Sequence, residues 1–210
     1  LIWLRPYSCI QCNYMAGKQL AIHEFVTSKH IVSIHGVDKT INDYAPVVSI
    51  LRSMYEMLLV YHSIFITPKN QEEQTYLLQT WKYKGLEFLA KDNFINPSLI
   101  QTAKKEQDKF LQNIKCNPLY DETEFEKKIK HSNVVYFGGT GDCRHIVCCS
   151  FKDGWKMLEE TKCFNSNSVK SLYANLCAET HVTYYGLMKY EQQNDIKPSP
   201  RLTSLYLSCA

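Results

Sequence analysis

The fold class is indicated most directly by residues 133–151, which read NVVYFGGTGDCRHIVCCSF. Residues 134–137 are β-branched or aromatic, and such side chains favour a strand. The segment 138–142 has the glycine-rich composition of a turn, and a second apolar run follows over 143–151. Two strand-like runs joined by such a turn are typical of an antiparallel hairpin. We therefore predict a strand over 133–137 that returns antiparallel over 143–151.

Outward from this hairpin, strand-like and helical segments alternate along the chain. Apolar residues recur at three- and four-residue steps up to Tyr61, after a possible cap at Asn42 or Asp43, which predicts an amphipathic helix. Strands are also predicted over 6–37, around a turn at Ala16-Gly17-Lys18, and over 63–67, and helices over 70–91, 99–114, 154–161 and 169–191. This order favours an α/β fold with helices flanking a mixed sheet. No repeat or linker interrupts it, so we expect a single domain over 1–210.

The composition argues against several classes of protein, such as disordered and membrane-spanning chains. Of the 210 residues, 45% are hydrophobic and 12% aromatic, far from the composition of a disordered chain. The net charge of +3 is too small to indicate a nucleic-acid binder by itself. No window approaches the ~20 consecutive apolar residues of a membrane span, so no membrane partner is expected. The chain begins at Leu1, without Met or the pattern of a signal peptide, and we expect a fragment of a longer protein.

The cysteines indicate a reducing environment. There are nine, an odd number, and none lies between Cys12 and Cys116. Cys148 is followed directly by Cys149, which is awkward for two separate disulfide bonds. The spacing is unlike a disulfide framework. We therefore expect free thiols or metal ligands in an intracellular protein, either cytoplasmic or nuclear.

Two groups of cysteine and histidine have the chemistry of zinc ligands. The first is Cys9, Cys12, His23 and His30. Ten residues separate Cys12 from His23 and six separate the two histidines, whereas a two-cysteine, two-histidine finger has about twelve and then three to five. The alternative is a hairpin whose alternate residues are core.

The second group is denser. It comprises Cys143, His145, Cys148 and Cys149, four ligand-type residues within a short stretch of the predicted returning strand. If they meet at one side of a turn, zinc is the cofactor that they would bind. The alternative is a strand with buried thiols, a common environment for cysteine.

Aromatic and basic residues alternate at Trp81-Lys82-Tyr83-Lys84. Such alternation can stack on and neutralise single-stranded nucleic acid, so Trp81, Lys82 and Lys84 are candidate nucleic-acid-binding residues. Because these positions fall in a predicted helix, their side chains spread around its axis. A half-buried helix wall is therefore the competing interpretation.

Hydrolytic motifs are not apparent. The run Gly138-Gly139-Thr140-Gly141 lacks the lysine and the serine or threonine of a phosphate-binding loop. The acidic residues have no spacing that demands a metal-binding role. No catalytic residue is therefore assigned.

Several stretches, taken in chain order, carry a family resemblance. They are PYSCIQCNY at 6–14, IHEFV at 22–26, SIHGV at 33–37, SIFITP at 63–68, and the ending Cys149-Ser150, Trp155 and Cys163. In this order they resemble the Maelstrom domain, an RNase H-like fold related to DnaQ-type 3′ exonucleases. The resemblance implies an RNase H-like sheet, single-stranded RNA as a partner and a role in small-RNA silencing.

The chain departs from that family at its metal-binding positions. The family's metal-site glutamate would fall at Ser8, and the Asp-x-Glu of an active DnaQ-type nuclease is not visible. Two-metal hydrolysis needs such carboxylates. The resemblance therefore implies a nuclease-derived, RNA-associated domain without two-metal catalysis. Two alternatives stay open: a protein-interaction module with buried free cysteines, which would bind other proteins, and an atypical metal-dependent nuclease.

Overall fold

The computed structural model describes residues 5–27, 30–34, 37–41, 45–91, 96–162 and 166–180. The chain divides into two compact units. The first combines Leu1–Cys9 with Glu56–Lys170, and the second combines Ile10–Tyr55 with Ser171–Ala210. We describe each unit by itself, and the single domain expected over 1–210 stays a prediction.

The N-terminal part of the chain is helical, contrary to our prediction of strands. Helix α1 spans Arg5–Thr27, so the predicted hairpin around Ala16-Gly17-Lys18 is wrong. Glycine lowers helix stability by only about 1 kcal/mol relative to alanine, a cost that a long helix tolerates. Strand β1 (His30–Ile34) then pairs antiparallel with β2 (Val37–Ile41). The strand predicted near residue 31 is therefore confirmed.

Helix α2 (Ala45–Tyr61) confirms the predicted amphipathic helix, and the described chain continues into a short π-helix, η1 (His62–Ile66). The strand predicted over 63–67 is wrong. The backbone N–H of Thr67 donates to the carbonyl of His62, five residues earlier, at 3.0 Å. This wider turn buries three consecutive side chains, which are those of His62, Ser63 and Ile64.

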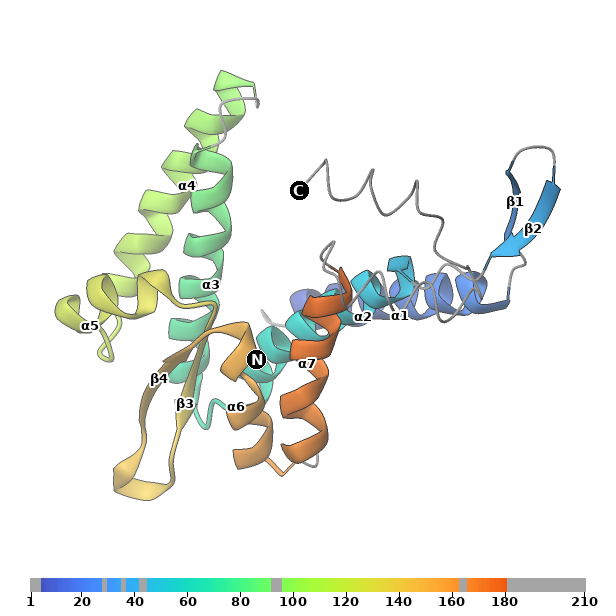
Figure 1. Cartoon of the computed structure of the whole chain (residues 1–210). Helices are drawn as coiled ribbons and strands as arrows, with labels where there is room; N and C mark the ends of the chain where they lie inside the picture. Colours follow the sequence, from blue (N-terminus) through green and yellow to red (C-terminus); the bar gives the residue numbers. More distant parts are fainter. Residues whose placement is uncertain are drawn as a thin grey trace. The chain divides into compact units, whose positions relative to one another are not determined.

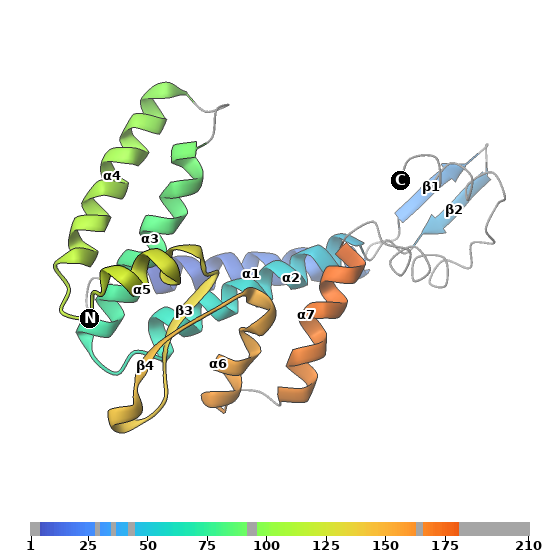
Figure 2. The same cartoon turned by 60° about the vertical axis from the view of Figure 1, so that its left-hand side comes forward.

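Helices α3 (Gln71–Lys91) and α4 (Pro97–Lys115) confirm two predicted helices and run alongside each other (Figures 1 and 2). The Asn96 side chain accepts a hydrogen bond from the Ser98 backbone N–H at 2.9 Å, and Pro97 follows at the first helical position. Both are favoured at a helix N-terminus. The packing of α4 against α3 is supported by the Gln107 side-chain amide on α4, which donates a hydrogen bond to the Tyr83 carbonyl on α3 at 3.3 Å.

The hairpin that indicated the fold class is confirmed. Strand β3 (Val134–Gly138) pairs antiparallel with β4 (His145–Cys149), with Val134 opposite Cys149. A short 3-10 helix, η3 (Gly141–Cys143), lies between the strands. Before the hairpin come α5 (Glu122–Lys127) and η2 (Ile129–His131), and after it η4 (Phe151–Asp153), α6 (Trp155–Glu160) and α7 (Ser166–Thr180). The predicted helices over 154–161 and 169–191 are confirmed as far as the described residues extend.

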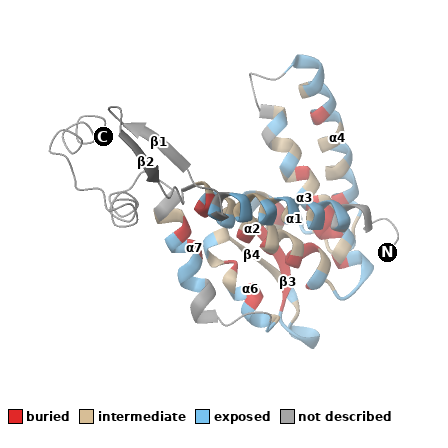
Figure 3. Cartoon of the chain, turned by 90° about the vertical axis from the view of Figure 1, so that its right-hand side faces the viewer, coloured by how far each residue is buried: buried red, intermediate tan, exposed pale blue. Residues whose placement is uncertain are grey.

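The first unit is built around β3. All five of its residues are buried (Figure 3). One face of the hairpin joins a hydrophobic core to which η1, α3, α4, α5 and η2 also contribute. The core residues from these helices are Ile64, Tyr76, Leu77, Leu78, Tyr83, Ile114, Phe125 and Ile129. Burying such a large apolar side chain contributes about 1.5–3 kcal/mol. The core therefore places α3 directly against the hairpin.

The described residues combine helices and strands, but helices dominate. Their strands form two separate two-stranded antiparallel sheets. The fold is therefore α/β in the broad sense that we predicted. Among the described residues, no helix is both long and apolar enough to cross a membrane.

Candidate functional site

A cavity of about 230 Å³ lies beside α3 in the first unit. Its wall combines residues from the end of α2, from η1, from α3, from β3 and the two residues before it, and from η4. They are Val60, Ser63, Ile64, Leu77, Thr80, Trp81, Lys84, Gly85, Ser132, Asn133, Val135 and Phe151. Two of the three predicted nucleic-acid-binding residues are in this set. We call it the Trp81–Lys84 cavity.

Trp81 and Lys84 lie three residues apart on α3, a spacing that places two side chains on the same helix face. Trp81 is 38% exposed, so solvent reaches part of its ring. The Lys84 amine donates a hydrogen bond to the Ile129 carbonyl at 3.2 Å. Burial lowers the pKa of Lys84 from its ordinary value. The wall therefore offers an aromatic face and a partly desolvated amine.

Three hydroxyl groups line the same cavity, and one of them lacks a partner. Ser63 Oγ donates to the Val60 carbonyl at 2.8 Å, and Ser132 Oγ donates to the Lys128 carbonyl at 2.7 Å. Thr80 is only 1% exposed, and its Oγ1 has no hydrogen-bond partner in the described part of the chain. A buried hydroxyl without a partner is costly, and the Thr80 oxygen has less than 1 Å² of accessible surface, so it lies beneath the cavity wall and out of reach of a group inside the cavity.

The remaining residues of the predicted nucleic-acid motif face elsewhere. The Lys82 amine lies 5.3 Å from the centroid of the Phe110 ring on α4. Tyr83 is 7% exposed, and its ring centroid is 5.7 Å from that of Phe125. For Lys82 and Tyr83, the interpretation as a helix wall therefore describes the structure better than nucleic-acid binding.

The predicted zinc ligands lie along η3 and β4, but they do not share one face. His145 and Cys149 alternate with Cys148 on β4, so the Cys148 side chain lies on the opposite face of the strand. Cys148 packs against the core together with Val135. Cys143 and His145 are exposed, and His145 Nδ1 lies 2.9 Å from the Cys143 carbonyl oxygen.

The two adjacent thiols are partly buried. Burial raises the pKa of the Cys148 thiol, and burial raises the pKa of Cys149 to about 11. Zinc binds thiolates, which a raised pKa disfavours. Within the described residues, no group of three His, Cys, Asp or Glu side chains could hold a metal ion. Zinc at Cys143, His145, Cys148 and Cys149 stays a prediction, which the metal content of purified protein would test.

The first cysteine and histidine group lies mainly on α1. Cys12 and His23 are eleven residues apart on this helix, or about 16 Å at 1.5 Å per residue. A zinc ion lies only 2.0–2.3 Å from its ligands. The two residues cannot therefore share a metal, and the finger interpretation is wrong. Cys9 and Cys12 are exposed thiols, and nothing further is described for the side chain of His30.

A second hollow, of about 430 Å³, borders the far end of β4. Its residues are His131, Ser132, Asn133, Cys148, Cys149, Ser150, Asp153 and Lys156, of which Ser132 and Asn133 also line the Trp81–Lys84 cavity. Ser150 Oγ donates to Asp153 Oδ2 at 2.8 Å. Burial raises the pKa of the Cys149 thiol, which disfavours the nucleophilic thiolate form at neutral pH.

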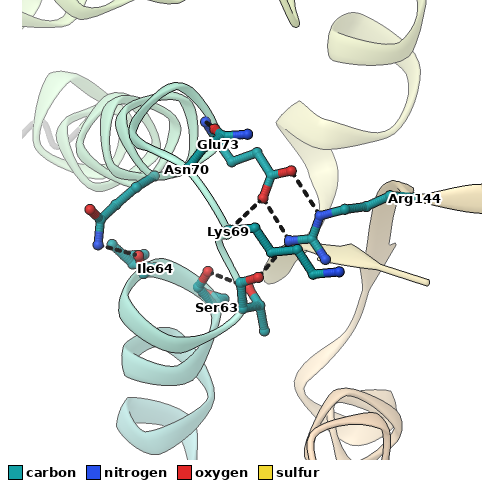
Figure 4. A network of polar contacts seen from close by, with 8 residues as sticks. Ser63, Ile64, Lys69, Asn70, Glu73 and Arg144 are labelled. Carbon is teal, nitrogen blue, oxygen red and sulfur yellow. Dashed lines mark hydrogen bonds and ion pairs between the residues drawn. The ribbon is translucent and has the colours of Figure 1, made fainter. Parts of the chain in front are cut away.

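A buried ion pair, which the sequence analysis missed, joins the hairpin to α3 (Figure 4). Arg144 Nε donates to Glu73 Oε1 at 2.8 Å, and Arg144 Nη2 donates to Glu73 Oε2 at 2.6 Å. Arg144 Nη2 also donates to the Thr67 carbonyl at 2.5 Å. The sequence places Glu73 in the first turn of a helix but does not indicate its partner, 71 residues away. The pair holds the start of β4 against the N-terminus of α3.

The comparisons with known proteins identify no relative. No family model matches the chain, and neither a curated protein nor a solved structure matches it significantly. A function must therefore be argued from the cavity and its chemistry.

Proposed function

We propose that this chain binds single-stranded RNA and that one base docks at the Trp81–Lys84 cavity. The observation that carries the proposal is the shared wall: a partly exposed tryptophan ring and a lysine amine line one cavity on the same face of α3. An aromatic ring beside a cation is the combination that single-strand binders use.

Each component has a physical role in this proposal. A base that stacks on an aromatic ring contributes about 1–3 kcal/mol, and every base has a face that can stack. The Lys84 amine supplies positive charge in a region that is partly shielded from solvent, where electrostatic attraction is stronger than in water. Apolar residues such as Leu77 and Val135 complete the wall. The cavity therefore supports the docking of a single flat ring.

The wider biological role rests on the sequence resemblance. Similarity to the Maelstrom domain supports the proposals of an RNase H-like, nuclease-derived fold, an intracellular location and a role in small-RNA silencing. Ser8, at the position of the family's metal-site glutamate, supports the proposal that the domain does not catalyse two-metal hydrolysis.

RNA binding can be tested by fluorescence anisotropy with a labelled single-stranded oligonucleotide over a salt series. We expect Trp81→Ala to weaken binding by about 5- to 150-fold, from the stacking energy of 1–3 kcal/mol. Trp155→Ala is the matched control, because Trp155 also has lysine amines near its ring, at 5.9 Å for Lys156 and 5.3 Å for Lys170. RNA binding that depends on Trp155 and not on Trp81 would contradict the proposed site.

A pair of lysine variants tests the charge. Lys84→Met should weaken binding, whereas Lys82→Met should leave it unchanged because the Lys82 amine lies over Phe110. Absence of RNA affinity at every salt concentration would defeat the proposal and favour a protein partner. Cleavage of the RNA in the presence of Mg²⁺ or Mn²⁺ would contradict the non-catalytic role and favour the atypical nuclease.

A further inference from the structure

We infer that the hollow at the far end of β4 holds the ribose and phosphate of the nucleotide whose base docks in the Trp81–Lys84 cavity, so that the chain prefers RNA to DNA. We call it the Asp153–Lys156 hollow. This inference rests on the proposed RNA binding and adds the recognition of the sugar and the phosphate. It depends on the position of the hollow, on its lining and on two charged side chains.

The Asp153–Lys156 hollow adjoins the cavity. Ser132 and Asn133, the two residues before β3, line both of them. The short helix η4 also borders both, since Phe151 lines the cavity and Asp153 lines the hollow. In a nucleotide, the ribose is bonded directly to the base and carries the phosphate. A base in the cavity can therefore place its ribose past Ser132 and Asn133 and its phosphate in the hollow.

The lining of the hollow suits a sugar and a phosphate better than a second base. Each of its eight residues carries a polar group or a thiol, and no Phe, Tyr, Trp or aliphatic residue is among them. A base would need an aromatic face on which to stack. The volume of about 430 Å³ lies within the range of about 300–1,000 Å³ that is typical of ligand sites.

Two serine hydroxyls of the hollow are already engaged. Ser132 Oγ donates to the Lys128 carbonyl at 2.7 Å and is also hydrogen-bonded with the Cys148 thiol. Ser150 Oγ donates to Asp153 Oδ2 at 2.8 Å. These bonds hold the lining in place. Recognition of a ligand therefore depends on the other polar groups of the hollow.

The carboxylate of Asp153 is the acceptor for the sugar. A carboxylate offers about four acceptor positions on its two oxygens, and the Ser150 hydroxyl occupies one of them. Carboxylates bind ribose hydroxyls in the same way at dinucleotide sites. The 2′-hydroxyl allows a protein to distinguish RNA from DNA, so a bond from this hydroxyl to Asp153 would favour RNA.

The ammonium group of Lys156 supplies the charge for the phosphate. Lys156 is exposed on α6, and its described contact is with the Trp155 ring, whose centroid is 5.9 Å away. Burial is the main cause of the raised pKa of Cys149; the charge of Asp153 adds to this rise and the charge of Lys156 opposes it. Both charges therefore act beside the same thiol. The exposed Asn133 amide and His131 ring add further polar groups to the hollow.

Oligonucleotides of twelve uridines and of twelve 2′-deoxyuridines test the inference with the full chain, because they differ in the sugar alone. We expect the ribose oligomer to bind about 10-fold more tightly, which corresponds to about 1.4 kcal/mol. Asp153→Ala should abolish this preference. Ser150→Ala is the matched control, because it removes the same hydrogen bond within the hollow but keeps the carboxylate, and it should retain the preference.

A salt series with the ribose oligomer tests the phosphate contact. Lys156→Met should make the slope of log affinity against log salt less negative by about 0.7, the value for one phosphate of a single strand. Lys152→Met removes an exposed charge from η4 outside the hollow and should leave the slope unchanged.

The outcomes separate this inference from the proposed function. If neither oligomer binds, the proposed function fails. If both bind equally and Trp81→Ala weakens both, binding at the cavity stands and the recognition of the ribose is wrong. Equal loss of the preference in Ser150→Ala and Asp153→Ala, or an unchanged salt slope in Lys156→Met, would also overturn the inference.

Discussion

Replacing Glu73 by glutamine should destabilise the first unit strongly, although the two side chains have the same shape. Glu73 Oε1 accepts from Arg144 Nε, and Glu73 Oε2 accepts from Arg144 Nη2 and from the Lys69 backbone N–H at 2.9 Å. Both carboxylate oxygens are thus acceptors. A glutamine amide must turn its NH₂ group toward one of these donors, whichever way it is oriented.

The magnitude follows from burial. The side chains of Glu73 and Arg144 are only 8% and 13% exposed. A hydrogen bond to a charged group contributes about 1.5–3 kcal/mol, and leaving one partner of a buried ion pair without its counter-charge costs about 3–5 kcal/mol. We expect Glu73→Gln to lower the free energy of unfolding by about 3 kcal/mol, a large part of the 5–15 kcal/mol typical of a domain.

The assay is urea unfolding at pH 7, followed by circular dichroism and tryptophan fluorescence, for Glu73→Gln, Arg144→Met and the double variant. The double variant should be less unstable than the sum of the two single variants, because each single change leaves a buried group unpaired. A loss below about 0.5 kcal/mol for Glu73→Gln, or strict additivity in the double variant, would refute the reasoning.

The same ion pair predicts a dependence on pH. The hydrogen bond from Arg144 lowers the pKa of Glu73 below its ordinary value of 4.5. A carboxylate with a lowered pKa stabilises the folded state above its unfolded pKa, and this contribution is lost as the pH falls through the folded pKa. The difference in free energy of unfolding between wild type and Glu73→Gln should therefore reach its full size above pH 4.5 and become smaller as the pH falls below that value.

Three further predictions concern the hairpin and its surroundings. Gly139 has a φ of +81°, and a Cβ there would lie 2.6 Å from the Cys143 carbonyl oxygen. Gly139→Ala should therefore lower the free energy of unfolding in urea by more than about 2 kcal/mol. Gly141 has a φ of +56° but open space around a Cβ, so Gly141→Ala should lower it by about 1 kcal/mol. Asp121 caps α5, so Asp121→Ala should cost about 1 kcal/mol and Asp121→Asn much less, measured in the same way. Because its pKa is about 11, Cys149 should react with iodoacetamide at pH 8 far more slowly than the exposed Cys143, as mass spectrometry of the peptides would show.

Local signals predicted much of the first unit correctly. The helices over 71–91 and 97–115 and the hairpin around Gly139 each have a periodicity, a cap or a turn that acts within a few residues. The errors have a common cause. Residues 5–27 and 62–66 contain runs that favour strands locally, but the first forms a helix despite Gly17, and the second continues a helix that has already begun. Propagating an existing helix is easier than starting a new element.

The candidate site was predictable only in part. The alternation at 81–84 pointed to Trp81 and Lys84, which share the cavity, but also to Lys82, which does not. The helical period separates them, and a helix prediction alone contains that information. Thr80 carried no signal, because a hydroxyl without a partner is visible only once its surroundings are known. The pairing of Glu73 with Arg144 is equally a property of the tertiary structure.

The π-helix η1 has a consequence for the register of the chain. A turn of this kind holds one residue more than an α-helical turn, so every side chain before it is rotated by about 100° relative to an unbroken α-helix. Deleting a single residue from 62–66 should convert the segment into regular α-helix and turn Ser63 away from the wall that it now shares with Thr80. One extra residue in this turn therefore decides whether Ser63 contributes to the wall of the pocket.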